Sequence, residues 1–235
     1  MQANVAARVK PPSADDYEGR ALSQAEVNHL LEAVTDTLYQ ALVWLAIDTG
    51  ARQGELLALQ TEDVDLEGGL IHIRRSVRRI TGQGMVYSPP KTKLSKRTVE
   101  IAPATISVLR AHRMAQKERR LRAGDLWDTN ADLFFTNDVG GPLDGVGVTK
   151  GFQKLVANAG LGNLRFHDLR HSSATRLLAA GARMDEVRTR MGHSSIMTTV
   201  NIYGHQTANG ASVAEKMQSI LTSTATVSDG WLANG

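Results

Sequence analysis

Between Leu70 and Ile101 the spacing of the hydrophobic residues changes from helical to extended and then back, and this change limits the folds open to the chain. Within this stretch β-branched residues alternate with polar ones, Gly82 to Gly84 supplies a turn, and residues 98–101 close the pattern as a strand. The flanking segments carry apolar residues at helical spacing. The pattern predicts a mainly helical α+β fold with one small antiparallel sheet.

Helix signals are clear on both sides of this sheet. Ser23 and Glu26 form a capping box that opens the first helix, and Gly50 ends the second. The other helices are expected near residues 37–49, 103–123, 146–159, 167–180, 183–191, 196–203 and 211–221, with a short apolar strand at Leu133–Phe135. Pro11 and Pro12 break helices, so residues 1–21 are expected to be a linker.

Composition excludes several classes of protein. The 235 residues are enough for one substantial core, and the absence of cysteine rules out disulfides, thiolate metal sites and a cysteine nucleophile. No apolar run approaches the ~20 residues that span a bilayer, so the expected location is the cytoplasm, with no membrane partner.

The charge is unevenly distributed, although the net charge is only +3. Residues 71–122 contain 14 Lys and Arg against two acids, a balance of +12, whereas the other residues carry 13 basic and 22 acidic side chains, a balance of −9. Short charge runs are usually solvated faces. A block of this size inside a folded domain favours a polyanion such as nucleic acid as the partner.

Several local patterns could carry chemistry, although each has a simpler interpretation. Arg52 and Glu55 share one helix face, as a surface ion pair would, yet a carboxylate can also fix an arginine for an oxyanion. His167 and Arg170 begin a helix, where an anion would be favoured. His193 follows a glycine and Tyr203 ends a helical stretch, and such residues are more often structural.

In this order, the patterns resemble those of the tyrosine recombinases of the phage integrase type. The resemblance covers residues 22–205 and includes the motif Ala-Arg-x-Gly-Glu-Leu-Leu, a lysine on a basic hairpin turn, His-x-x-Arg, Gly-His and the tyrosine. It implies site-specific DNA recombination, such as phage integration and excision, by cleavage and rejoining through a 3′-phosphotyrosine.

The resemblance also implies roles for individual residues. Arg52 and Arg170 would clamp the scissile phosphate, Glu55 would orient Arg52, and His167 would act as general acid and base. Lys91 would protonate the leaving 5′ oxygen, although Lys93 lies on the same turn. His193 would hydrogen-bond a phosphate oxygen, and Tyr203 would be the nucleophile. DNA contacts are expected from the basic block, through Arg74, Arg75, Lys93, Lys96 and Arg97.

The expected partners follow from the same resemblance. They are double-stranded DNA carrying specific sites, three further copies of the chain in a tetramer on DNA, and accessory DNA-bending proteins. No metal ion, ATP or other cofactor is expected. The apolar stripe within residues 206–235 fits docking on its own domain or on a neighbouring protomer. The chain is expected to lack the core-binding and arm-binding domains that precede this domain in the family.

Two other functions use similar features. A type IB topoisomerase shares the phosphotyrosine chemistry but relaxes supercoils, and the sequence around Arg52 and Tyr203 favours the recombinase. A non-catalytic DNA-binding module would keep the fold without the full set of reactive residues, and here the set is intact.

Overall fold

The computed structural model describes residues 19–89, 96–130 and 132–192. Its elements, in chain order, are α1 (Gln24–Ala33), α2 (Gln40–Thr49), α3 (Gln53–Leu56), η2 (Thr61–Asp63), β1 (Val64–Asp65), β2 (Leu70–Ile73), β3 (Ser76–Ile80), β4 (Gly84–Ser88), β5 (Arg97–Glu100), α4 (Pro103–Ala123), η4 (Gly124–Leu126), α5 (Gly145–Asn158), α6 (Asp168–Ala179) and α7 (Met184–Met191). Among these described residues, no helix has the length and apolar character needed to cross a bilayer.

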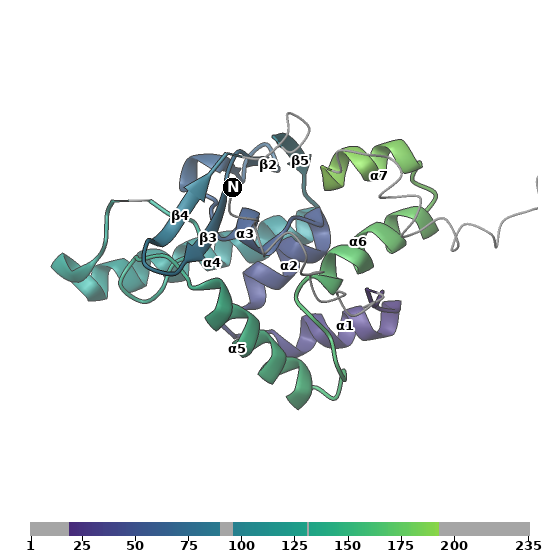
Figure 1. Ribbon diagram of the computed structural model, residues 1–235, viewed down its shortest axis with the longest axis horizontal. Helices are drawn as coiled ribbons and strands as arrows, with labels where there is room; N and C mark the ends of the chain where they lie inside the picture. Colours follow the sequence, from purple (N-terminus) through teal and green to yellow (C-terminus); the bar gives the residue numbers. More distant parts are fainter. Residues whose placement is uncertain (1–18, 90–95, 131, 193–235) are drawn as a thin grey trace, which may run out of the picture.

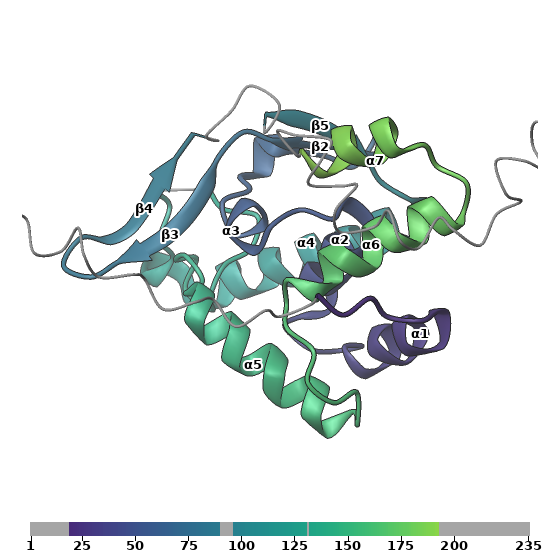
Figure 2. The same cartoon turned by 45° about the vertical axis from the view of Figure 1, so that its right-hand side comes forward.

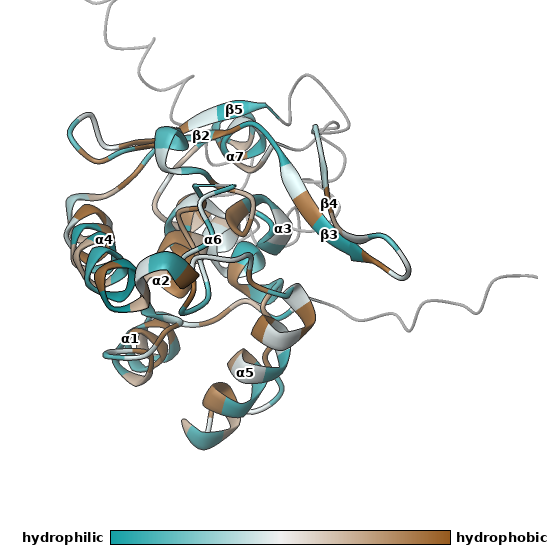
Figure 3. Cartoon of the chain, turned by 90° about the vertical axis from the view of Figure 1, so that its left-hand side faces the viewer, coloured by the Kyte–Doolittle hydropathy of each residue, from teal (hydrophilic) through white to brown (hydrophobic). Residues whose placement is uncertain are grey.

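The helices surround α2, which forms the centre of the core. Its sequence is apolar almost all round, and it buries six of its ten residues, as expected for a helix enclosed by others. It packs against both α4 and α6, and α1 lies against α2 and α5 (Figure 1). Brown and teal bands alternate along α5 in Figure 3, because this helix buries only one side, through Val148, Phe152 and Val156.

The extended region forms two small antiparallel sheets where one was expected (Figure 2). The first has the order β1-β2-β5, and the second pairs β3 with β4. The strands β4 and β5 therefore pair along β3 and β2 and not with each other. Ser88 at the end of β4 pairs with Ser76, and Arg97 at the start of β5 pairs with Ile73. The two strands that flank the basic segment therefore do not pair with each other, as they would in the expected hairpin.

The expected strand at Leu133–Phe135 is not formed, and only Leu133 makes an isolated bridge, with Gln60. Side chains of α4 bind the carbonyl groups that a strand partner would use. The Gln116 amide donates to the carbonyl oxygens of Leu133 and Phe134 at 3.0 and 3.1 Å, and His112 Nε2 donates to that of Phe134 at 3.0 Å. This apolar segment is a buried loop held on α4.

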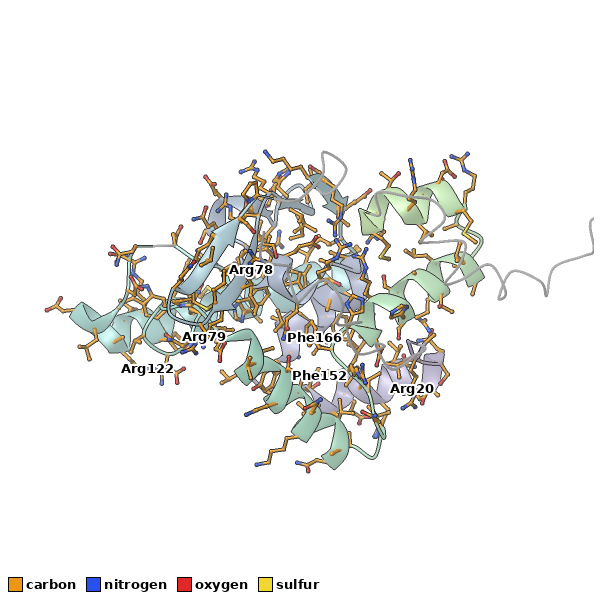
Figure 4. All side chains as sticks on the ribbon, viewed as in Figure 1. Arg20, Arg78, Arg79, Arg122, Phe152 and Phe166 are labelled. Atoms are coloured by element: carbon orange, nitrogen blue, oxygen red, sulfur yellow. The ribbon has the colours of Figure 1, made fainter. Side chains whose placement is uncertain are left out.

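The start of α6 is fixed by aromatic packing. The ring of Phe166, which lies just before α6, meets the ring of Phe152 of α5 edge to face, with centroids 5.3 Å apart (Figure 4). Both residues are buried. Since Phe166 precedes His167, this contact sets where the expected catalytic imidazole emerges from the core.

The first described residues already pack on the domain. Arg20 pairs with Glu26 and donates to the carbonyl oxygen of Leu161 at 2.5 Å, and the backbone N–H of Leu22 donates to Ser172 Oγ at 2.9 Å. The capping box of α1 is confirmed, since Ser23 and Glu26 bind each other's backbone N–H groups.

Candidate active site

Arg52 occupies the N-cap position of α3, immediately after the turn that ends α2. Gly50 makes that turn with a φ of 61°, a left-handed conformation that favours glycine. The side chain of Arg52 is 44% exposed, and its Nη1 donates to Glu55 Oε1 at 3.0 Å. The backbone N–H of Arg52 donates to Glu55 Oε2 at 2.9 Å. One part of the guanidinium is thus fixed while much of it faces solvent.

Glu55 is buried and binds a second arginine that the sequence suggested would contact DNA. Arg97, at the start of β5, places Nη2 3.0 Å from Glu55 Oε2, and both side chains are only 5% exposed. The expectation that Arg97 binds DNA does not agree with this position. The Glu55 carboxylate holds the Arg97 guanidinium in the interior of the described domain.

The carboxylate of Glu55 is held in its ionised form. Burial alone would raise the pKa of Glu55, but the charge and hydrogen bonds of Arg97, together with Arg52, outweigh burial and lower that pKa. From the sequence, only the pairing of Glu55 with Arg52 could be predicted, because Arg97 lies 42 residues beyond Glu55.

Arg170 lies inside the domain, on the first turn of α6. Its side chain joins the ends of two helices, since Nη1 donates to the carbonyl oxygen of Gly50 at 2.6 Å and Nη2 donates to that of Met191 at 2.8 Å. Arginine has five N–H donors in a planar fork, so a single side chain can bind both helix ends. Arg170 therefore connects the segment that carries Arg52 to the end of α7.

The carboxyl end of α7 is held by two more arginines. Arg97 Nε donates to the carbonyl oxygen of Arg190 at 2.7 Å. The side chain of Arg190 reaches Asp48 near the end of α2, with Nη2 2.8 Å from Oδ1. Gly192 follows with a φ of 67° and is the last described residue before His193. These contacts fix the point from which the chain continues toward His193 and Tyr203.

His167 lies close to both expected clamp arginines. Partial burial and the charges of His171, Arg170 and Arg52 lower the pKa of His167 to about 4, while Asp168 acts in the opposite direction. The rings of His167 and His171 meet edge to face, with centroids 5.3 Å apart. His171, one helical turn further on, was missed by the sequence analysis, although its spacing of four residues places it on the same face. His167 is thus neutral near pH 7 and able to accept a proton.

A phosphate bound between these groups should raise the pKa of His167. We expect a site-specific DNA ligand to move the NMR titration of the His167 ring upward from about 4, because an anion stabilises the imidazolium. A group whose pKa rises on binding takes up a proton, so DNA affinity should increase as the pH falls through the pKa of His167 in the complex toward about 4.

His112 is the internal control for this titration. Burial lowers its pKa as well, but it is bound to Phe134 in the core, so DNA should leave its titration unchanged. Equal shifts of both rings, or no shift of His167, would contradict a phosphate site beside His167.

The other expected DNA-binding residues lie along the sheets. Arg74 Nη1 is 3.2 Å from Asp63 Oδ1, and Arg75 Nη2 is 3.3 Å from Glu62 Oε1, so both arginines pair with acids of η2. Lys96 is exposed. Arg78 and Arg79 of β3, labelled in Figure 4, add further positive charge to this side.

Four expected site residues lie outside the described residues, namely Lys91, Lys93, His193 and Tyr203. The structure thus describes Arg52, Glu55, His167 and Arg170. For the other four it describes only the chain that leads up to them, as far as residues 89 and 192. Within residues 19–89, 96–130 and 132–192, no three His, Asp or Glu side chains are grouped as metal ligands.

A cavity of about 570 Å³ lies between the segment before α2, α4 and α5. None of Arg52, Glu55, His167 and Arg170 lines it. The cluster of catalytic candidates is therefore separate from this cavity, and Arg52 and His167 are both open to solvent. Such an arrangement suits a group on a large polymer.

Two guanidiniums beside a neutral imidazole, one of them fixed by a buried carboxylate, define a site for an oxyanion such as a phosphate. The chain belongs to the phage integrase family, whose model matches residues 20–209.

Its relatives include bacterial and phage recombinases. A "Tyrosine recombinase XerC-like" protein of Caldanaerobacter subterraneus subsp. tengcongensis is 34% identical over 205 residues, which are 83% of this chain and 52% of that protein. An integrase of Streptomyces ambofaciens is 32% identical over 80% of this chain and 49% of its own length. The chain thus spans about half the length of these relatives.

Solved structures confirm the mainly helical α+β fold. The crystal structure of XerA recombinase matches with a TM-score of 0.64 and 26% identity, over 86% of this chain and 65% of that one. The Tn1549 transposon integrase, solved in complex with transposon right end DNA, matches with a TM-score of 0.72 at 22% identity, over 91% of this chain and 68% of that one. The second likeness concerns the fold alone.

Proposed function

We propose that this chain is the catalytic part of a site-specific tyrosine recombinase, which breaks and rejoins DNA strands through Tyr203. The catalytic domain is residues 22–205, preceded by a linker and followed by a tail at 206–235. The observation that carries the proposal is the placing of Arg52 and Arg170 beside a neutral His167 in a chain of the phage integrase family.

Each proposed step needs a group of this site. The phenolic oxygen of Tyr203 attacks the scissile phosphorus and gives its proton to a base, which we assign to neutral His167, whose pKa the bound phosphate would raise. The bond from phosphorus to the 5′ oxygen breaks, and that oxygen takes a proton from Lys91. The products are a 3′ phosphate ester of the tyrosine and a free 5′ hydroxyl.

Rejoining reverses these bonds. A 5′ hydroxyl from the partner strand attacks the phosphotyrosine, the new bond from phosphorus to oxygen forms, and the phenol is released. The phosphodiester energy is kept in the ester, so the reaction needs neither ATP nor a metal ion. Arg52, Arg170 and His193 would stabilise the negative charge that develops on the phosphate oxygens.

Recombination is favoured over DNA relaxation because the relatives are named recombinases and integrases. A purely DNA-binding role would leave the fixed Arg52 and the neutral His167 without a use. The proposed assembly is a tetramer on double-stranded DNA with accessory DNA-bending proteins. Since the relatives come from bacteria and phages, the proposed reaction takes place in the bacterial cytoplasm.

The test uses nicked duplexes of random sequence whose 5′ fragment is lost after cleavage, so that the covalent product accumulates. The protein is incubated with this pool in EDTA, and adducts that resist denaturant are isolated and digested. The expected result is a nucleotide attached to the peptide that contains Tyr203, together with released DNA whose 5′ end is a hydroxyl. An adduct through a 5′ phosphate, or one that requires a divalent metal, would refute the proposed chemistry.

A further inference from the structure

The buried carboxylate of Glu55 binds two arginines, Arg52 and Arg97. Glu55 Oε1 accepts from Arg52 Nη1 at 3.0 Å and from Arg97 Nη1 at 3.4 Å. Glu55 Oε2 accepts from the backbone N–H of Arg52 at 2.9 Å and from Arg97 Nη2 at 3.0 Å. Four donors from α3 and β5 therefore hold both carboxylate oxygens, and the carboxylate cannot turn without losing several of them.

Arg97 also reaches the other end of the site. Its Nε donates to the carbonyl oxygen of Arg190 at 2.7 Å. A Cβ added at Gly192 would lie 2.8 Å from Arg97 Nη1, so the guanidinium fills the space that a side chain at this position would need. Arg97 thus packs against the backbone from which the chain continues to His193.

We propose that Arg97 is a positioning residue for DNA cleavage: it fixes the Glu55 carboxylate that orients Arg52, and it fixes the end of α7 that leads to His193 and Tyr203. This inference rests on the proposed function. Arg97 acts through other residues and does not touch the DNA, because its side chain is 5% exposed and its three nitrogen atoms all have protein acceptors.

The role of Arg97 has a chemical consequence that simple packing would not have. The charged groups that face the Glu55 carboxylate are Arg97 from β5 and Arg52 from its own helix. Without Arg97, burial would act on Glu55 with only Arg52 to oppose it, so the pKa of Glu55 should rise. A protonated Glu55 would hold Arg52 less firmly, and cleavage would then depend on the ionisation of Glu55.

The experiment compares Arg97→Met, Arg97→Lys and a double variant that adds Glu55→Gln to Arg97→Met. The rate of adduct formation in a single turnover is measured from pH 5.5 to 9, together with DNA affinity and thermal unfolding. Arg110→Met is the matched control, because Arg110 is exposed on α4 and binds the Glu67 side chain and the Leu66 carbonyl, away from Glu55.

Arg97→Met should lower the cleavage rate at pH 7 by about 10- to 100-fold, the usual effect of a small misplacement of a catalytic group. Its rate should recover at higher pH, and Glu55→Gln should remove that recovery. Arg97→Lys keeps the charge and should keep a pH profile close to the original. DNA affinity should change by less than about twofold in all variants, since phosphate contacts are unchanged.

Two results would overturn the inference. One is an Arg97→Met protein that is folded and has the original cleavage rate and pH profile. The other is a loss of DNA affinity that equals the loss of cleavage, as expected if Arg97 bound the DNA. If Arg97→Met does not fold, Arg97→Lys decides, because loss of the two-pronged contact should still slow cleavage by misplacing Arg52.

A measurement on the free protein separates this inference from the proposed function. If the original protein forms no adduct, the proposed function fails, but the carboxyl titration of Glu55 and the Nε–H signal of Arg52 can still be followed by NMR. Arg97→Met should move both signals, and should it not fold, Arg97→Lys should move the Arg52 signal, whereas Arg110→Met should move neither. Unchanged Glu55 and Arg52 signals in a folded Arg97 variant would overturn the positioning role independently of catalysis.

Discussion

Replacing Tyr203 with phenylalanine is expected to reduce covalent adduct formation by at least about 10⁴-fold, the scale seen when an enzyme loses its nucleophile. The change removes only the phenolic oxygen, so no phosphoester can form at this position. DNA affinity should stay within about twofold, because binding depends on phosphate contacts made by cationic residues elsewhere. Denaturing gels and fluorescence anisotropy with the same nicked duplex measure the two quantities.

Tyr87→Phe is the matched control. Tyr87 lies on β4 and is 40% exposed, so the loss of its hydroxyl should leave both adduct formation and binding unchanged. If adducts still form with Tyr203→Phe but not with Tyr87→Phe, the nucleophile is Tyr87 and the assignment to Tyr203 is wrong. A parallel loss of DNA binding in Tyr203→Phe would point to a role in binding.

Arg170→Met is expected to destabilise the fold by about 2–4 kcal/mol, because the carbonyl groups of Gly50 and Met191 would lose their buried donor. Arg52→Met should cost less than about 1 kcal/mol, since Arg52 is 44% exposed and Arg97 still pairs with Glu55 in its absence. Urea unfolding followed by circular dichroism gives both values.

Both variants should nevertheless lose cleavage, because each removes a guanidinium from the phosphate site. The comparison therefore separates the structural work of Arg170 from the chemistry that the two arginines share. Equal losses of stability would contradict the buried position of Arg170, and normal cleavage by folded Arg52→Met would contradict its role at the phosphate.

Local sequence signals were enough for most helices. The capping box at Ser23, the glycine after α2 and the proline at the start of α4 each act within a few residues, so the elements that they bound were predicted closely. His167 and Arg170 are also only three positions apart, at the start of α6, so their proximity could be predicted from local spacing. The structure brings Arg52 to them because α2 packs on α6, and the order of the motifs had suggested this without giving the contacts.

Features that depend on distant residues could not be predicted from local patterns. The apolar segment Leu133–Phe135 has the composition of a strand, but its carbonyl groups are bound by Gln116 and His112 of α4. Arg97 lies in a run of basic residues and was expected to contact DNA, whereas its guanidinium binds Glu55 in the interior. The residues next to Arg97 in the sequence do not indicate that a distant buried carboxylate binds it.

The fixed end of α7 limits where the nucleophile can go. Tyr203 lies eleven positions after Gly192, and an extended chain covers at most about 3.6 Å per residue, so the Cα of Tyr203 cannot lie more than about 40 Å from that of Gly192. The tyrosine is therefore a tethered reagent whose effective concentration is set by the tether and not by the amount of protein in solution. Attack within one chain would then follow first-order kinetics, whereas attack on DNA held by a second copy would require the copies to assemble first.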